Sequence, residues 1–312
     1  MRNDFQDWEK LRRKPVAVLG AGVSGRGVGA LLDRLEWKYE TYDELGRDFG
    51  YTEARACSLV VFSPGFTMDH PWLELARENY IPVMGETDFG ACFLDNPVIA
   101  ITGTNGKTTL ATMLTHAWKA LGNSAVAAGN VGVPICKLLA DGLNRDTVVF
   151  LEVSSFQAQA MENLRPDNVL WTNFEADHLD HHTDEKEYFL AKANLVEKVG
   201  EGCVIVGRSV SEKAREFDYD LPLKTEVAER NGECSMNLPE DHFLTSFPQL
   251  ENLSIARGFA NSQGIAEKDF DEAIVDYRPE PHRLQKVATI GDATFWNDSK
   301  ATNAGAAVAA CR

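Results

Sequence analysis

One stretch of this chain, residues 97–118, constrains its fold more than any other. An apolar run at 98–101 leads into the loop Gly-Thr-Asn-Gly-Lys-Thr at 103–108, and apolar residues at helical spacing follow the loop. A strand, a glycine loop and an amphipathic helix in this order form a nest for phosphate, because the loop N–H groups and the positive end of the helix attract phosphate oxygens. We therefore predict an α/β fold with a nucleotide site at this loop.

Two side chains of the loop indicate ATP and Mg²⁺. Lys107 supplies a cation for the transferring phosphate, and the Thr108 hydroxyl is placed to bind Mg²⁺. The loop differs from a standard P-loop, because Ile101 stands where the first glycine would be. A surface turn before an ordinary helix is the alternative interpretation, and the apolar strand before the loop disfavours it.

Length, charge and cysteine spacing exclude several classes of protein. A chain of 312 residues suits two domains with part of a third. The net charge of −16, with no basic stripe, argues against a nucleic-acid binder. The 6 cysteines have no Cys-x-x-Cys spacing, which indicates neither a zinc site nor a disulfide framework. The sequence has no apolar signal core and no stretch as long as a membrane span, so we predict a cytoplasmic protein without membrane insertion.

The N-terminal part, residues 1–93, is predicted to be a first α/β domain. A strand at 16–19 is followed by glycines at 20, 22 and 25, a helical stripe and a strand that ends in Asp43, near the position of a ribose-binding acid. Another strand is expected at 59–62. The glycine triplet alone leaves three interpretations open: an NAD or FAD site, a site for another diphosphate, or a tight turn between a strand and a helix.

Residues 94–280 are predicted to form a second α/β domain. Its strands are expected at 97–101, 147–153, 168–173 and 202–206, and no element is assigned within 211–250.

Residues 281–312 are predicted to be the start of a third domain. The turn-prone segment Arg-Pro-Glu-Pro at 278–281 precedes it. A hairpin of strands at 284–290 and 293–296 and the first turns of a helix are expected to follow.

Several charged residues follow the strands of the second domain. Glu152 ends an apolar central strand, where parallel sheets place ligands, and is a natural Mg²⁺ partner for Thr108; a solvated cap is the alternative. His178 lies nearest a strand end and is a candidate for metal or substrate, whereas His181 and His182 are expected to be solvated. Lys192 receives no role from its helical position, because a lysine there would extend to water.

Together these motifs resemble the Mur ligases, ATP-dependent enzymes that add amino acids to the peptidoglycan precursor. The last motif, Asn-Asp-Ser-Lys-Ala-Thr-Asn, is typical of the members that add D-glutamate. In family order and over almost the whole chain, the resemblance rests on residues 102–109, Gly-Asn-Val-Gly at 129–132, Leu-Glu-Val-Ser-Ser-Phe-Gln at 151–157, Asp-His at 177–178, Lys192, Pro-His-Arg at 281–283 and residues 297–303.

The resemblance implies an architecture and a reaction. A Rossmann-like N-terminal domain would hold UDP rather than NAD, and a P-loop-type Mur ligase central domain and the start of a third Rossmann-like domain would follow. ATP would phosphorylate the carboxylate of UDP-N-acetylmuramoyl-L-alanine, and the amine of D-glutamate would attack the acyl phosphate. The partners would be these small molecules, with no nucleic acid, and a monomer is expected.

The resemblance also implies roles for single residues. Lys107 would stabilise the γ-phosphate charge, and Lys192 would be carbamylated so that it can face a metal. Thr108 and Glu152 would hold one of two Mg²⁺ ions and His178 the second; Lys107, Glu152, His178 and Lys192 form the catalytic set. ATP would contact Gly103, Thr104, Asn105, Gly106, Lys107, Thr108, Thr109, Asn252, His282, Arg283 and Asp298, and the substrate would contact Ser24, Gly65, Asn130, Ser154, Gln157, Lys300 and Thr302.

The chain departs from the family pattern at three places. Of the nucleotide motif at 246–252 only Asn252 remains, Glu44-Leu45 replaces the Thr-Arg often found near uridine, and most of the D-glutamate domain has no counterpart. We therefore expect the chain to be inactive alone.

Three alternative functions stay open. Another Mur ligase or a folylpolyglutamate synthase-like ligase conflicts with the motif at 298–303. An NAD-dependent oxidoreductase rests only on the glycine triplet. The third alternative is a non-catalytic protein that binds nucleotide or UDP-muramoyl peptide.

Overall fold

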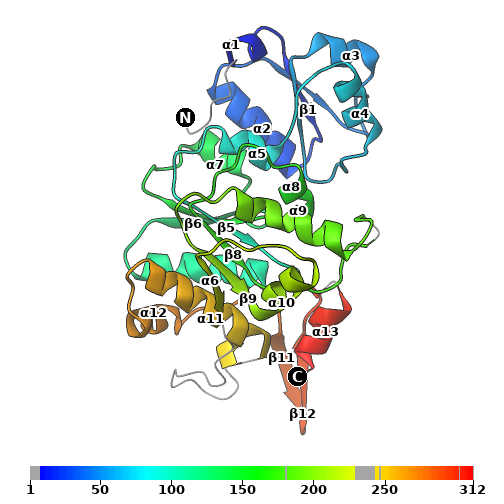
Figure 1. Ribbon diagram of the computed structural model, residues 1–312. Helices are drawn as coiled ribbons and strands as arrows, with labels where there is room; N and C mark the ends of the chain where they lie inside the picture. Colours follow the sequence, from blue (N-terminus) through cyan, green and yellow to red (C-terminus); the bar gives the residue numbers. More distant parts are fainter. Residues whose placement is uncertain (1–7, 180, 229–242, 246, 302, 312) are drawn as a thin grey trace. The chain divides into compact units, whose positions relative to one another are not determined.

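The computed structural model describes residues 8–179, 181–228, 243–245, 247–301 and 303–311 (Figure 1). The chain divides into two compact units, the first made of residues 1–98 and 127–166 and the second of residues 99–126 and 167–312. Both units combine parallel strands with helices, so the predicted α/β class is confirmed. The division into three domains stays a prediction.

The first unit contains a four-stranded sheet in the order β2-β1-β3-β4. Its pairings are parallel, and Val16 of β1 lies opposite Tyr39 of β2 and Leu59 of β3. The central strands β1 and β3 are fully buried, which explains why their sequences are apolar throughout. The strands are β1 (Val16–Leu19), β2 (Tyr39–Tyr42), β3 (Leu59–Phe62) and β4 (Val83–Gly85).

Successive residues of β1 belong to two different cores. Val16 and Val18 pack in a cluster with Phe89, whereas Ala17 and Leu19 pack in another cluster, as the alternation of a strand requires. Burying one such side chain stabilises the fold by about 1.5–3 kcal/mol. The helices of this unit are α1 (Trp8–Leu11), α2 (Val23–Arg34), α3 (Tyr51–Ala56), α4 (Pro71–Glu78), α5 (Glu86–Ala91), α7 (Ile135–Asp141) and α8 (Ser155–Gln159), and α2 packs against α7.

Two more strands lie mostly or wholly in the first unit. They are β6 (Ala125–Gly129) and β7 (Val148–Glu152), which are neighbours in the strand order.

The second unit holds four strands that pair in the order β10-β9-β8-β5. They are parallel, and Thr102 at the end of β5 lies opposite Trp171 at the end of β8. The segments that follow these two strands therefore start at the same edge of the sheet. The strands are β5 (Val98–Thr102), β8 (Asn168–Trp171), β9 (Val204–Gly207) and β10 (Thr225–Ala228).

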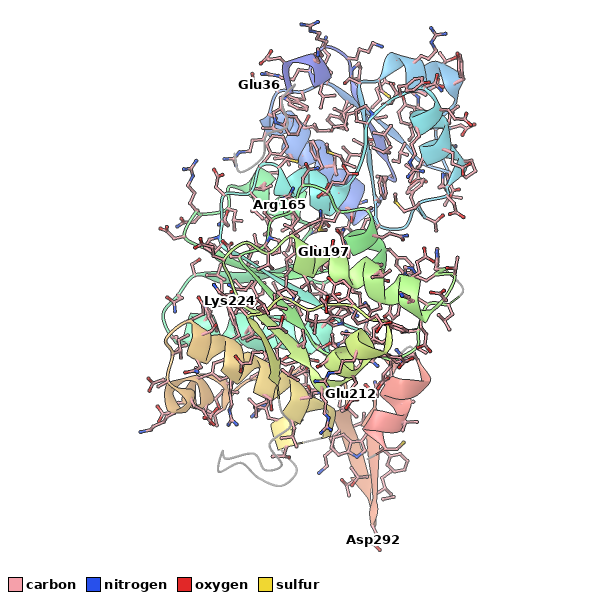
Figure 2. All side chains as sticks on the ribbon, in the orientation of Figure 1. Glu36, Arg165, Glu197, Glu212, Lys224 and Asp292 are labelled. Carbon is pink, nitrogen blue, oxygen red and sulfur yellow. The ribbon has the colours of Figure 1, made fainter. Side chains whose placement is uncertain are left out.

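Helices and a hairpin complete the second unit. The antiparallel hairpin of β11 (Gln285–Ile290) and β12 (Ala293–Asn297) ends in a turn at Asp292, which Figure 2 labels at its tip. The helices are α6 (Lys107–Ala120), α9 (Glu185–Glu197), α10 (Arg208–Glu216), the short 3₁₀ turn η1 (Phe243–Thr245), α11 (Phe247–Ser262), α12 (Glu267–Ile274) and α13 (Ala304–Ala310).

Most expected elements are present. The predicted strands of the second α/β region correspond to β5, β7, β8 and β9, and the hairpin and final helix are also confirmed. Within 211–250 the structure adds β10, η1, most of α10 and the start of α11, whereas 229–242 and 246 lie outside the described residues. The helix α10 escaped prediction because its buried face contains few apolar side chains, chiefly Val210 and Ala214. Among the described helices, none is long and apolar enough to cross a membrane.

Candidate functional site

The loop between β5 and α6 needs its two glycines. Gly103 has φ 142° and Gly106 has φ 83°, values that side-chain-bearing residues rarely adopt. A Cβ at Gly103 would overlap the Thr172 hydroxyl, and a Cβ at Gly106 would lie 2.7 Å from the amide oxygen of Asn252. Other parts of the second unit therefore pack directly against this phosphate loop, defined as residues 103–108.

The segment that follows β8 holds the phosphate loop. The N–H groups of Thr104 and Asn105 donate to the backbone and side-chain oxygens of Asn173 at 3.1 and 2.9 Å. The Thr172 hydroxyl donates to the Asn105 carbonyl at 2.6 Å, and the Thr104 hydroxyl exchanges hydrogen bonds with the backbone of Glu175. Residues 172, 173 and 175 carry no predicted role, although their place after β8, a strand that pairs with β5, is a usable signal.

Two lysines donate to the same carbonyl of the phosphate loop. Lys107 Nζ lies 2.9 Å from the oxygens of Gly103 and Thr104, and Lys192 Nζ lies 2.9 Å from the Gly103 oxygen. The expectation that Lys192 extends to water is wrong, because the residue is only 1% exposed. Helix α9 directs it to the loop, where its ammonium also lies 4.5 Å from the Tyr188 ring centroid.

Tyr188 lies beside this lysine, and His182 packs on Tyr188. Burial raises the pKa of Tyr188, whose hydroxyl donates to Thr104 at 3.3 Å. His182 is buried rather than solvated, since its ring packs 5.2 Å from that of Tyr188, and burial lowers its pKa. The prediction for His182 was therefore wrong, whereas His181 is exposed as expected.

His178 lies at a strained position beside a carboxylate. Its φ is 54°, its side chain is 43% exposed, and its Nε2 lies 3.8 Å from the Asp177 carboxylate. No group of three or more His, Cys, Asp and Glu side chains gathers as a metal site within the described part of the chain. A metal at this place would therefore need hydroxyl, phosphate, water or modified side-chain ligands besides these residues.

The segment before the hairpin brings a third cation to the phosphate loop. Arg283 Nη2 donates to the Thr108 hydroxyl at 2.9 Å. Asp298 instead accepts from the Leu284 N–H at 3.0 Å, and His282 Nδ1 lies 2.9 Å from Asn297 Nδ2. Arg283 thus joins the loop, while His282 and Asp298 shape the turn that carries it.

Of the remaining predicted ATP and substrate residues of this unit, Asn252 is buried and Lys300 is exposed. Asn252 is 2% exposed and lies against Gly106, with its amide nitrogen donating to Gln249 at 3.1 Å. Lys300 is exposed, and Thr302 lies outside the described residues. Asn303, which was not predicted to have a role, hydrogen-bonds to both Asn105 and Asp177.

The first unit has its own glycine loop, residues 20–25. Gly20 has φ 100°, and a Cβ at Gly25 would overlap the Gly20 carbonyl. Asp43 accepts from the N–H groups of Ala21 at 2.8 Å and Leu45 at 3.1 Å, and these hydrogen bonds lower the pKa of its carboxyl. Asp43 therefore braces the glycine loop in this structure.

Predicted substrate residues lie at the same edge of this sheet. Ser24, in the first turn of α2, is partly exposed, and Gly65, in the loop after β3, is exposed; they follow the paired strands β1 and β3. A Cβ at Gly20 would lie 2.7 Å from the Ser63 hydroxyl, a buried group for which the described residues provide no hydrogen-bond partner. The small polar side chain of Ser63 therefore packs against the glycine loop.

A second polar group of the first unit centres on Glu152. This carboxylate is only 2% exposed and accepts from the Asn130 amide at 2.9 Å, so the solvated-cap interpretation is wrong. Ser154 and Gln157 form the capping box that begins α8, and the Gln157 amide donates to Thr87 at 3.1 Å. The structure thus brings Asn130 to Glu152, and Ser154 to Gln157.

Comparison with known proteins identifies related sequences. Residues 101–231 match the family model described as the Mur ligase middle domain. The UDP-N-acetylmuramoylalanine--D-glutamate ligase of Koribacter versatilis is 32% identical over 340 residues, which cover 96% of this chain and 75% of the relative. The enzyme of the same name from Desulfotalea psychrophila is 31% identical over 343 residues, covering 94% and 72%.

Solved structures share the fold. UDP-N-acetylmuramate:L-alanyl-gamma-D-glutamyl-meso-diaminopimelate ligase from Neisseria meningitides has a TM-score of 0.60 at 16% identity, covering 86% of this chain and 99% of that chain. UDP-N-acetylmuramate-alanine ligase from Thermotoga maritima has a TM-score of 0.54 at 17% identity, covering 89% and 72%. At these identities the likeness concerns the fold alone.

Proposed function

This chain belongs to the UDP-N-acetylmuramoylalanine--D-glutamate ligase family, and from this premise we propose how its residues carry out the reaction. It is an ATP-dependent, amide-bond-forming ligase that adds D-glutamate to UDP-N-acetylmuramoyl-L-alanine in peptidoglycan precursor synthesis. The observation that carries the site is the placement of Lys107 and Arg283 on the phosphate loop of a chain whose net charge is −16. Such a local set of cations suits a polyphosphate substrate.

The proposed reaction has two steps at this site. A substrate carboxylate oxygen attacks the γ-phosphorus of ATP, the bond to the β-phosphate oxygen breaks, and an acyl phosphate and ADP result. The amine of D-glutamate then attacks the acyl carbon, which forms the amide and releases phosphate and a proton. Lys107 lies on the loop carbonyls and would move its ammonium to the γ-phosphate oxygens, where it stabilises the developing charge.

Thr108 fits the proposed Mg²⁺ site. Its hydroxyl oxygen already accepts from the cationic guanidinium of Arg283 in this structure, and Mg²⁺ prefers hard oxygen ligands. When bound, the ion would neutralise charge on the β- and γ-phosphate oxygens. Glu152 and His178 remain proposed ligands, as does a second Mg²⁺ ion. Arg283 would exchange the Thr108 hydroxyl for a phosphate oxygen when ATP and the ion bind.

Electrostatics supports carbamylation of Lys192. The Nζ atoms of Lys107 and Lys192 are both 2.9 Å from the Gly103 oxygen, so they lie at most about 5.8 Å apart. Two ammonium groups so close, one of them buried, oppose each other's charge. A neutral Lys192 amine would attack CO₂, form an N–C bond and lose a proton, giving a carboxylate-like group that attracts Lys107 and can face a metal.

The substrate is proposed to use the polar groups of the first unit. Ser24 and Gly65 would contact the UDP part beside the glycine loop, and Asn130, Ser154 and Gln157 would contact the muramoyl-alanine part. Lys300 and Thr302 stay proposed contacts at the reacting end. We also propose a cytoplasmic, monomeric protein that acts on small molecules.

One experiment tests the proposed function directly. The chain is incubated with Mg²⁺, ATP, UDP-N-acetylmuramoyl-L-alanine and single amino acids, and products are detected by mass spectrometry. Membership of the family favours a D-glutamyl product that forms only with ATP, in place of the inactivity expected from the sequence alone. A product with another amino acid would contradict the D-glutamate assignment, and ATP binding without any product would favour the non-catalytic alternative.

A further inference from the structure

Asn303 connects three parts of the second unit through one side chain. Its amide nitrogen donates to the side-chain oxygens of Asn105 at 3.0 Å and Asp177 at 2.8 Å. Its amide oxygen accepts from Asn105 Nδ2 at 3.4 Å and from the Ala306 N–H, in the first turn of α13, at 2.8 Å. The phosphate loop, the segment after β8 and α13 therefore meet at this residue.

These contacts use the full hydrogen-bonding capacity of an asparagine side chain, which has two donor hydrogens and two acceptor lone pairs. The orientation of the amide is fixed by chemistry, because the Asp177 carboxylate can only accept and the Ala306 N–H can only donate. Aspartate at 303 would lack both donors and face a like charge. Serine would keep an acceptor for α13 but could not bridge the other two partners.

A second contact shows that α13 approaches the same segment closely. A Cβ at Gly305 would overlap the Glu175 carboxylate, and that carboxylate also accepts from Asn105 Nδ2 at 3.3 Å. The side chain of Asn105 thus lies between Glu175 and Asn303, while its backbone is held by Thr172 and Asn173. Glycine at 305 and asparagine at 303 are both required for this arrangement.

We propose that Asn303 is a positioning residue, which fixes the Asn105 side chain in the phosphate loop and the Asp177 carboxylate beside His178, and so ties α13 to the nucleotide site. This inference rests on the proposed ATP site. Asn303 acts through its neighbours: without its amide, Asn105 loses a partner on its side chain, and Asp177 loses the donor that orients it. The loop then has more conformations to lose when ATP binds, which weakens binding.

The test measures binding of ATP with Mg²⁺ by calorimetry for the wild-type chain, Asn303→Ala and Asn303→Ser. The serine variant retains a cap for α13, so it separates bridging from capping. We expect both variants to bind ATP about tenfold more weakly, the effect of losing one or two hydrogen bonds. Asn261→Ala, an exposed position on α11, is the control and should bind like the wild type.

Exchanging the amide and the carboxylate between positions 303 and 177 tests the hydrogen bond that joins these two side chains. Asn303→Asp places two carboxylates together and should bind more weakly than Asn303→Ala, whereas adding Asp177→Asn recreates an amide–carboxylate pair and should recover most of that loss. A merely structural residue would show no such recovery. The proposal is overturned if Asn303→Ser binds ATP like the wild type, or if adding Asp177→Asn to Asn303→Asp recovers no ATP affinity. Failure of the wild type to bind ATP contradicts the proposed function instead.

Discussion

The two glycine loops of this molecule, residues 103–108 and 20–25, each follow a buried strand but have different surroundings. In the phosphate loop, Lys107 is partly buried and shares the Gly103 carbonyl with the buried Lys192. In the loop at 20–25, the exposed Arg26 donates to the Ala21 carbonyl and an acid, Asp43, braces the backbone. Glycine spacing therefore sets the backbone path of both loops, while side chains from other elements decide which ligand each loop suits.

The largest effect should come from removing the central cation of the phosphate loop. We predict that Lys107→Ala lowers ATP-dependent phosphate release by a factor of about 10² or more, because an ammonium that stabilises transition-state charge is lost. Phosphate release is measured in a coupled assay under saturating ATP. Lys119→Ala, an exposed lysine on the same helix α6, is the matched control. Retained turnover in the Lys107 variant would exclude the proposed role.

A carbamate on Lys192 would place a negative group beside the phosphate loop, and so increase the difference in surroundings between the two loops. We predict a carbamate carbon signal by ¹³C NMR after incubation with ¹³C-bicarbonate, and its loss in Lys192→Ala. The signal should weaken as pH falls, because protonation removes the amine form that attacks CO₂. Lys119→Ala should keep the signal. A wild-type chain that shows none would refute the modification.

Alanine at one glycine of each loop should separate the two sites. Gly103→Ala should weaken ATP binding and spare binding of the UDP substrate, and Gly25→Ala should do the reverse, because each added Cβ meets backbone or a buried hydroxyl. Overpacking of this kind costs about 1–3 kcal/mol. Gly200→Ala, outside both loops, is the control, since nothing lies within 4 Å of its Cβ position. Equal loss of both ligands in either variant would mean that the loops are not independent.

The smallest effect should come from the acid that braces the glycine loop. Asp43 has a lowered pKa because the Ala21 and Leu45 N–H groups favour its ionised form, so its stabilisation is present above its unfolded pKa and lost as pH falls through the lower folded value. We predict that Asp43→Asn is less stable than the wild type at neutral pH and that the difference shrinks below pH 3.8. Urea unfolding at several pH values measures it. A difference that does not change with pH would contradict this role.

The sequence was most informative where chemistry depends on neighbours along the chain. The phosphate loop, its helix and the strands could be predicted because spacing and periodicity are local properties. The burial of Lys192 could not, since it depends on how α9 packs behind the loop. The contact between Asn303 and Asn105 spans 198 positions, and no local pattern reports such a meeting.

The burial of His182 and Glu152 also depends on how the chain packs rather than on a local sequence pattern. The buried His182 lies in a polar stretch that reads as solvent-facing, and only packing on Tyr188 covers it. Glu152 at a strand end is covered in a similar way, with the Asn130 amide as its partner. Residue type and position therefore identified candidates, whereas exposure had to come from the fold.

Hydrogen–deuterium exchange on the wild-type chain tests the central claim, that the two glycine loops take different ligands. ATP with Mg²⁺ should slow exchange of the backbone N–H groups at 103–109 and leave those at 20–25 unchanged. UDP-N-acetylmuramoyl-L-alanine alone should slow exchange at 20–25 and 63–65 instead. Protection of residues 20–25 by ATP, or of residues 103–109 by the UDP substrate alone, would contradict the account.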